Sequence, residues 1–134
     1  MTIDFAAAQQ IFAAQPFSQL LGATLTRFEP GTAEVVIPLA ASLRQQHGTA
    51  HGGVLSYAAD TVITFAAGTL AGDSVLTAEM KINYVRGARG GHLVARADVV
   101  HSGSTLVIVS CEVLDRDNAG DRLCAIAQGT VARR

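Results

Sequence analysis

The sequence predicts one α+β domain in which an antiparallel β-sheet wraps around one long central helix, with a short helix at the N-terminus. Three observations lead to this prediction. The chain has 134 residues, which suits a single domain over residues 1–134. One helical segment is apolar on nearly all sides and therefore needs cover on most of them. Six strand-like runs are joined largely by short turns, which favours antiparallel pairing.

The N-terminal part is expected to form a helix followed by a β-hairpin. Residues 4–14 carry apolar side chains at helical spacing, and Pro16 is expected to end this helix. Two strand-like runs follow at residues 22–28 and 32–39. Between them, the pair Pro30-Gly31 fits the middle of a type II turn.

The central helix and the remaining strands follow a polar loop at residues 40–50. Residues 52–68 are expected to form the buried helix. Four further strands are predicted at about residues 74–86, 91–102, 104–115 and 121–132. Glycine, serine and asparagine residues at the breaks between these strands are typical of turns.

Alternation within two of these strands predicts which side chains face the core. In the first, apolar residues alternate with polar or charged ones, so one face is expected to hold Ala78, Met80, Ile82 and Tyr84. In the third, the same spacing predicts a core face made of Val107, Val109, Cys111 and Val113.

Composition excludes several classes of function. Ten basic and eleven acidic residues give a formal charge of -1, and no long basic run is present, so nucleic acid is not expected as a partner. Cys111 and Cys124 lie in apolar runs without C-x-x-C spacing, which predicts buried thiols in a reducing compartment and no metal site. The N-terminus lacks the basic region of a signal peptide, and no stretch approaches the ~18 uninterrupted apolar residues of a membrane span. We therefore expect a cytoplasmic protein with no membrane partner.

The stretch QQHGTAHGGVLSYAADTVITFAA, residues 45–67, carries the clearest chemical signal. Gly52 and Gly53 open the predicted central helix, where backbone N–H groups lack helical partners and the macrodipole is positive. Because no side chain intervenes, a substrate oxygen could reach these groups and find an oxyanion hole. The alternative is that the glycines only allow a sharp turn into the helix.

Asp60 lies in the middle of this apolar helix, with no Lys or Arg at the helical neighbour positions. It is a candidate nucleophile or general base, the alternative being an acid that reaches solvent or an N–H donor. Eight helical steps separate Gly52 from Asp60, roughly 12 Å at 1.5 Å per residue. If both groups act on one carbonyl, they must come from two chains, as in a two-fold dimer with adjacent helices.

Three segments together carry a family resemblance: QHGTAHGGV at 46–54, ADT at 59–61 and LTAEMKINY at 76–84. They resemble the hotdog-fold acyl-CoA thioesterases of the phenylacetic-acid-pathway (PaaI-like) type, and the likeness runs over about residues 16–130. The H-G-G motif alone would be weak evidence. Its combination with A-D-T and with the strand motif is fairly specific.

The resemblance implies dimers whose two sheets join, often paired into tetramers, and hydrolysis of an acyl-CoA. No metal or cofactor is implied, since coenzyme A is part of the substrate. The acid at Asp60 would be the nucleophile or the base that activates water, acting across the dimer interface. The backbone N–H of Gly52 would polarise the thioester carbonyl.

Three further catalytic assignments come from the same resemblance. Gln45 stands where related enzymes often have an asparagine that holds water or the carbonyl, and its amide offers the same groups on a longer arm. Thr77 matches a hydroxyl near the acid, but strict alternation would place it opposite Ala78 and Met80, so this role requires a β-bulge. His51 would contact the carbonyl or orient the loop, the alternative being a helix-entry histidine satisfied by backbone.

Substrate contacts are assigned to Gly53, Tyr57, Arg86, Arg89 and the turn at Gly103. Arginine suits phosphate binding, so the two arginines and the turn could meet the phosphates of coenzyme A. The alternatives are that the arginines are only solvated, and that Tyr57 lines the core or a dimer seam.

Two other functions remain open on the same scaffold. A non-catalytic acyl-CoA-binding module would keep the glycines but would not need an acid at the carbonyl. A hydratase or dehydratase would use a histidine and an acid in a different motif, which this sequence lacks. The acyl group itself is left open: aryl, medium-chain and hydroxylated aromatic acids all fit.

Overall fold

Two short helices open the chain in the computed structural model, which describes residues 3–134. Helix α1 spans Phe5–Ala13, and the Asp4 carboxylate caps it by accepting a hydrogen bond from the backbone N–H of Ala7 at 2.8 Å. Pro16 ends the first helix, as expected, but it also begins a second helix, α2 (Pro16–Leu21), which the sequence analysis missed. Proline is compatible with a first helical position because no N–H partner is needed there.

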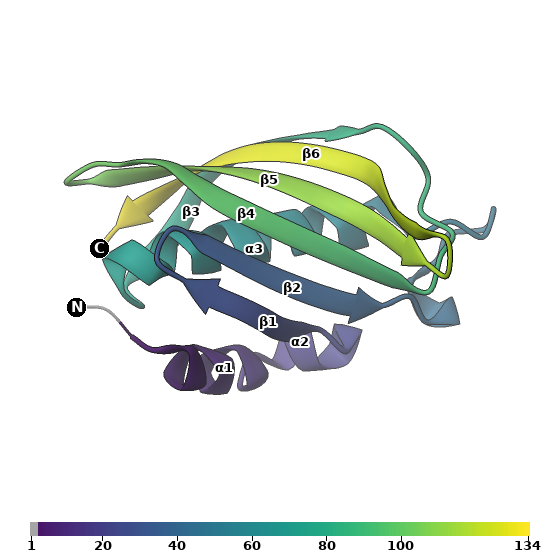
Figure 1. Cartoon of the computed structure of the whole chain (residues 1–134), viewed down its shortest axis with the longest axis horizontal. Helices are drawn as coiled ribbons and strands as arrows, with labels where there is room; N and C mark the ends of the chain where they lie inside the picture. The colour runs from purple at the N-terminus through teal and green to yellow at the C-terminus, as the bar shows by residue number, and fades with distance from the viewer. Residues whose placement is uncertain (1–2) are drawn as a thin grey trace.

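The sheet has six strands in the order β1-β2-β4-β5-β6-β3, and every neighbouring pair is antiparallel (Figure 1). The predicted strands are all present with ends shifted by a few residues, and a one-turn 3₁₀ helix, η1 (Ala41–Leu43), lies in the predicted polar loop. The strand bounds are Thr24–Glu29 for β1, Thr32–Pro38 for β2, Val75–Tyr84 for β3, His92–Ser102 for β4, Leu106–Asp117 for β5 and Gly120–Arg133 for β6.

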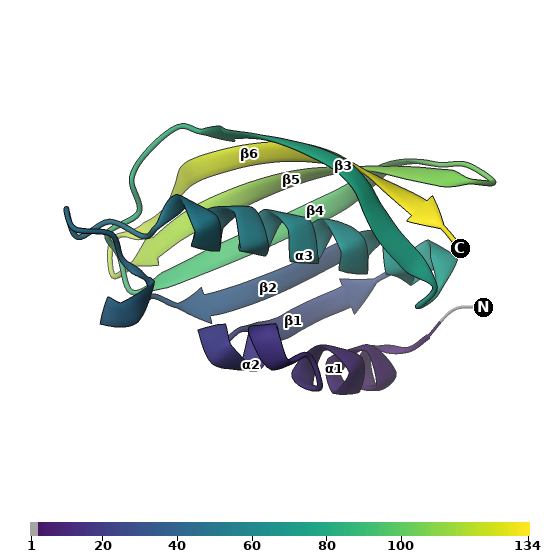
Figure 2. The ribbon, with the colours of Figure 1, turned by 180° about the vertical axis from the view of Figure 1, so that it is seen from behind.

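Helix α3, Gly52–Ala71, lies on the concave side of this sheet (Figure 2). It extends three residues beyond the predicted end at Gly68, and it contacts all six strands. By length and composition it is the one helix in the described chain that could cross a membrane, but 61% of its apolar stretch is buried inside the protein. The predicted wrapping of a sheet around a central helix is confirmed.

The wrapping leaves one side of α3 uncovered by the sheet. Strands β1 and β3 form the two edges of the sheet, and α1 and α2 lie beside β1 (Figure 2). Between these helices and β3, a stripe of α3 residues is only half-buried: Ser56, Tyr57, Asp60, Thr61 and Thr64. This stripe contains most of the polar side chains of the helix.

The predicted core faces are confirmed except at Ala78 and at Tyr84, which ends β3 and is 53% exposed. Val107, Val109 and Val113 are fully buried. Met80 and Ile82 pack against the core, whereas Ala78 is exposed. The prediction for Ala78 was wrong because a β-bulge lies between Thr77 and Glu79 and shifts the alternation by one residue.

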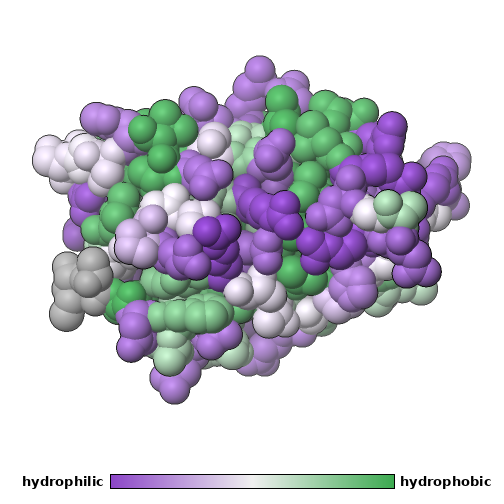
Figure 3. Space-filling model, viewed as in Figure 1, coloured by the Kyte–Doolittle hydropathy of each residue, from purple (hydrophilic) through white to green (hydrophobic). Residues whose placement is uncertain are grey.

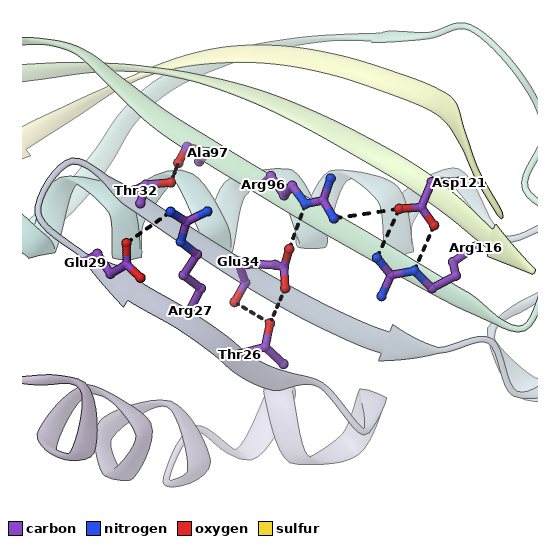
Figure 4. A network of polar contacts seen from close by, with 9 residues as sticks. All are labelled: Thr26, Arg27, Glu29, Thr32, Glu34, Arg96, Ala97, Arg116 and Asp121. Atoms are coloured by element: carbon purple, nitrogen blue, oxygen red, sulfur yellow. Dashed lines mark hydrogen bonds and ion pairs between the residues drawn. The ribbon is translucent and has the colours of Figure 1, made fainter.

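Hydrophilic residues cover the middle of the outer face of the sheet, with hydrophobic patches beside them (Figure 3). Figure 4 shows one polar network there, in which Arg96 bonds to Glu34 at 2.7 Å and Arg116 bonds to Asp121 at 2.8 Å. Burial by itself raises the pKa of Glu34, but hydrogen bonds from Arg96 and Thr26 outweigh it, and the pKa of this carboxyl is lowered.

Both cysteine thiols are free and buried, as predicted. Burial raises the pKa of the Cys111 thiol to about 12 and that of Cys124 to about 11. Neither thiol is therefore a nucleophile at neutral pH.

Candidate active site

The Asp60 carboxylate faces the uncovered side of α3 and is held by one hydroxyl. Thr77 Oγ1 on β3 donates to Asp60 Oδ1 at 2.6 Å. Asp60 forms no ion pair with any Lys, Arg or His in residues 3–134. Its second oxygen, Oδ2, has no hydrogen-bond partner in that part of the chain, so it remains available to water or substrate.

The β-bulge explains why Thr77 reaches the acid. If the strand alternated regularly through Ala78, Thr77 would share a face with Glu79 and Lys81 and point away from α3. Instead, Thr77 faces α3 and also lies 2.8 Å from Thr64 Oγ1, which can donate to the Asp60 carbonyl at 2.9 Å. The structure therefore places Thr77 beside the acid.

A groove of about 550 Å³ gives access to Asp60. Its floor is made of five residues of α3: Gly53, Ser56, Tyr57, Asp60 and Thr61. Thr77 and Met80 of β3 form one wall. The start of α2 forms the other wall through Pro16 and Phe17. An acid in a groove of this size is accessible to a substrate acyl group.

The N-terminus of α3 offers one free backbone donor near the other end of the groove. His51 caps the helix, and its Nδ1 accepts from the Gly53 N–H at 2.8 Å. The N–H of Val54 donates to the His51 carbonyl at 2.9 Å. The N–H of Gly52 has no acceptor in the described chain, so of the two predicted glycines, Gly52 is the one whose N–H is free for a substrate oxygen.

Gln45 lies in the loop before α3 and its amide is engaged within that loop. Its Nε2 donates to the Thr49 hydroxyl, and its Oε1 accepts from the His47 N–H at 2.5 Å. The structure thus places Gln45 as a brace for the loop and does not bring its amide to Asp60.

Tyr57 lines the groove one turn before Asp60. Its hydroxyl lies 2.5 Å from Ser18 Oγ, and its ring meets Phe17 edge to face at 5.3 Å between centroids. Burial raises the pKa of Tyr57, partly offset by hydrogen bonds from Ser18 and Thr61, so its phenol is neutral at pH 7. Ser18 and Phe17 belong to α2, which the sequence analysis did not predict.

The candidate phosphate-binding residues fall into two separate places within one chain. Arg86 and Arg89 line a surface hollow of about 480 Å³ near the start of β4, and Arg89 also donates to the His47 carbonyl at 3.1 Å. Gly103 lies in the turn after the far end of β4, where its carbonyl accepts from Arg133 at 2.9 Å. A single chain therefore does not bring Gly103 together with the two arginines.

Two charged residues that the sequence analysis missed fix the loops around the helix N-terminus. The buried Asp115 carboxylate accepts from the backbone N–H groups of Arg89 and Gly90 at 3.0 and 2.9 Å. Arg44 donates to four carbonyls in these loops, including those of Gly48 and Gly90 at 2.9 Å. No short motif marks either residue, because their partners are backbone groups distant in the sequence.

Comparison with known proteins identifies relatives over most of the chain. A model of the thioesterase superfamily matches residues 47–127. A predicted esterase of Deinococcus radiodurans is 34% identical, over 90% of this chain and 81% of that protein. A thioesterase family protein from Silicibacter pomeroyi superposes with a TM-score of 0.87 at 33% identity, covering 92% of each chain. The PaaI protein of the Escherichia coli phenylacetic acid degradation operon gives a TM-score of 0.87 at 22% identity, over 97% of this chain and 92% of PaaI, a likeness that shows the shared fold.

Proposed function

The chain belongs to the thioesterase superfamily and is a thioester hydrolase of the hotdog fold, and we propose that it acts as a PaaI-like acyl-CoA thioesterase. Its reaction would hydrolyse an acyl-CoA to a free acid and coenzyme A. The observation that carries this proposal is the geometry at Asp60. One carboxylate oxygen is held by Thr77, and the other is free in an open groove. The reaction needs water but no metal or cofactor.

In the general-base form of the reaction, Asp60 Oδ2 takes a proton from water while the water oxygen bonds to the thioester carbon. The carbonyl oxygen gains negative charge and is stabilised by the Gly52 N–H of a partner chain. The carbon–sulfur bond then breaks, coenzyme A leaves as a thiolate and takes the proton from Asp60. In the nucleophilic form, Oδ2 itself bonds to the carbon, and water hydrolyses the resulting anhydride.

The partner chain is needed because Gly52 and Asp60 of one helix are roughly 12 Å apart. Strand β3 supports such a pairing, since in the described chain it pairs only with β6 and its other edge is free. Apolar side chains near this edge are unusually exposed, at 54% for Leu76, 53% for Tyr84 and 52% for Val85. A two-fold axis midway between the two groups would bring the partner's Gly52 to Asp60 and the reverse.

His51 acts in this proposal as a positioning residue. By accepting from the Gly53 N–H, it fixes the first turn of α3 and leaves the Gly52 N–H as the free donor. The exposed arginines, Arg86 and Arg89, would receive the phosphates of coenzyme A.

Release of coenzyme A from a panel of acyl-CoA substrates, followed with a thiol reagent, tests the proposal. Asp60→Asn preserves shape but removes the base, so kcat should fall by about 10²- to 10⁴-fold. Asp98→Asn, the same change on an exposed residue of β4, is the matched control and should be close to wild type. Full activity of Asp60→Asn, or no release by the wild type from any substrate, would refute the proposed function.

A single turnover in ¹⁸O-labelled water separates the two forms of the reaction. The general-base route puts the label only into the product acid. Label recovered in the Asp60 carboxylate would instead identify the anhydride route, because water then attacks the aspartyl carbonyl.

A further inference from the structure

A second, smaller hollow lies beside the groove that contains Asp60. Its volume is about 130 Å³, and its apolar walls come from four elements: Ile11 of α1, Phe28 of β1, Phe65 of α3 and Val75 of β3. Phe28 and Phe65 meet edge to face at 6.5 Å between centroids. Walls of this kind favour a hydrocarbon group over a polar one.

The hollow is deepened by a missing side chain on α3. Gly68 lines it, and a Cβ placed on Gly68 would meet no atom within 4 Å. Glycine inside a helix is destabilising relative to alanine. No neighbouring atom would clash with a side chain at this position. We therefore attribute the glycine to the space that it leaves open in the hollow.

The hollow and the groove adjoin each other. Gln15 lines both. Thr64 lines the hollow, and its hydroxyl lies 2.8 Å from the Thr77 hydroxyl that holds Asp60. Along α3, Thr64 and Gly68 follow Asp60 by one and two turns, roughly 6 and 12 Å. An acyl group whose carbonyl lies at Asp60 can therefore extend along the helix into the hollow.

We propose that this hollow receives the distal end of the acyl group, about six carbons or a phenyl ring, and so selects an uncharged acyl group of about ten carbons or one that ends in a phenyl ring on a linker of similar reach. The inference rests on the proposed function and names the substrate class for the same site. The volume of about 130 Å³ is close to that of a cavity of roughly 150 Å³ that takes up benzene. Of the residues that line the hollow, only Asp73 is charged, and its carboxylate disfavours acyl groups that end in a carboxylate.

Gly68→Ala tests the inference by filling the hollow from within. The added methyl meets no atom within 4 Å, and alanine favours the helix, so the variant should melt at or above the wild-type temperature. The methyl group removes room for about one methylene. It should therefore lower the kcat/KM for decanoyl-CoA and for 6-phenylhexanoyl-CoA, each relative to that for acetyl-CoA, by about tenfold or more.

Two further variants make the test symmetrical. Ile11→Ala widens the hollow from α1 and should raise kcat/KM for dodecanoyl-CoA relative to decanoyl-CoA. Gly91→Ala is the matched control, because its Cβ also meets no atom within 4 Å but the residue lines neither the hollow nor the groove. In the wild type, the CoA ester of a ten-carbon dicarboxylic acid should be a poorer substrate than decanoyl-CoA by about tenfold or more. Equal effects of Gly68→Ala on all acyl groups, or no effect, would overturn the inference.

A binding measurement keeps this inference separate from the catalytic proposal. The probe is the inert thioether analogue of 6-phenylhexanoyl-CoA, in which a methylene separates sulfur from the carbonyl, titrated by calorimetry. Weaker binding to Gly68→Ala than to wild type supports the hollow even if no substrate is hydrolysed, a result that would reject only the proposed function. Equal binding to both proteins rejects the hollow even if hydrolysis is observed.

Discussion

Replacing Thr77 with valine removes one hydroxyl and keeps the β-branched shape of the side chain. The bulge and the packing of β3 should therefore survive, while Asp60 Oδ1 loses the hydrogen bond of 2.6 Å that holds it. A hydrogen bond to a charged group contributes about 1.5–3 kcal/mol. Because Asp60 is only half-buried, we expect the free energy of this hydrogen bond to lie near the lower limit of that range. A free energy of about 1.4 kcal/mol corresponds to a tenfold change in rate.

The predicted result is a fall in kcat of about tenfold with little change in KM, because Thr77 orients the acid and is not itself expected to bind the acyl-CoA. The assay is coenzyme A release detected by a thiol reagent, with the melting temperature measured in parallel. Cys111 and Cys124 are buried with raised pKa values, so their own reaction with the reagent should be slow. Thr77→Ser restores a hydroxyl at the same position and should recover most of the rate.

A matched control comes from the neighbouring strand. Thr130 donates to a Glu79 carboxylate oxygen at 3.0 Å, the same kind of contact on the outer face of the sheet. Thr130→Val should leave kcat within about twofold of wild type, since an exposed pair of this type contributes little. If Thr77→Val behaved like Thr130→Val, the argument that Thr77 positions the acid would fail.

Two further predictions concern the dimer and the stability of the sheet. A two-fold axis midway between the Gly52 N–H and the Asp60 carboxylate passes near Ser56. Ser56→Cys should therefore form a disulfide-linked dimer on a non-reducing gel, whereas the control variant Ser74→Cys should not. The pKa of Glu34 is lowered in the folded protein, so its contribution to stability is complete above the ordinary value of 4.5 and is lost as the pH falls through the lowered pKa. Urea unfolding at pH 5 and pH 3 should thus show a smaller loss of stability for Glu34→Gln than for wild type. An equal loss of stability in the two proteins would show that the Arg96–Glu34 ion pair does not stabilise the folded protein.

The sequence predicts the fold well because two different periodicities determine it. A helix that is apolar on nearly all sides requires a wrapping sheet, and alternation in the strands assigns the inner face, as at Val109 and Met80. Helix α2 was missed because six residues are too few to establish a helical period. Pro16 at its first position and Gly22, with φ 70° after its last, were the signals available.

Part of the candidate site could also be predicted from the sequence. Asp60 was identified as an acid without a cation at helical spacing in an apolar helix, and Gly52 by its place at the helix start. Their separation of roughly 12 Å along the helix predicts a site shared by two chains. The loop supports at Asp115 and Arg44 could not be found in this way. Their partners are carbonyl and N–H groups of distant loops, and backbone groups carry no residue-type signal.

The bulge in β3 reconciles two demands that a regular strand cannot meet together. Met80 and Ile82 must face the core, and they are even-numbered, whereas Thr77 must face Asp60 and is odd-numbered. With a strict period of two, any register that buries Met80 and Ile82 turns the Thr77 hydroxyl toward solvent. Inserting one unpaired residue at Ala78 changes the phase once, so that both halves of the strand face α3. Deleting Ala78 would therefore remove the conflict: Thr77, Glu79 and Met80 would then alternate regularly, and Thr77 and Met80 would both face α3 without a bulge.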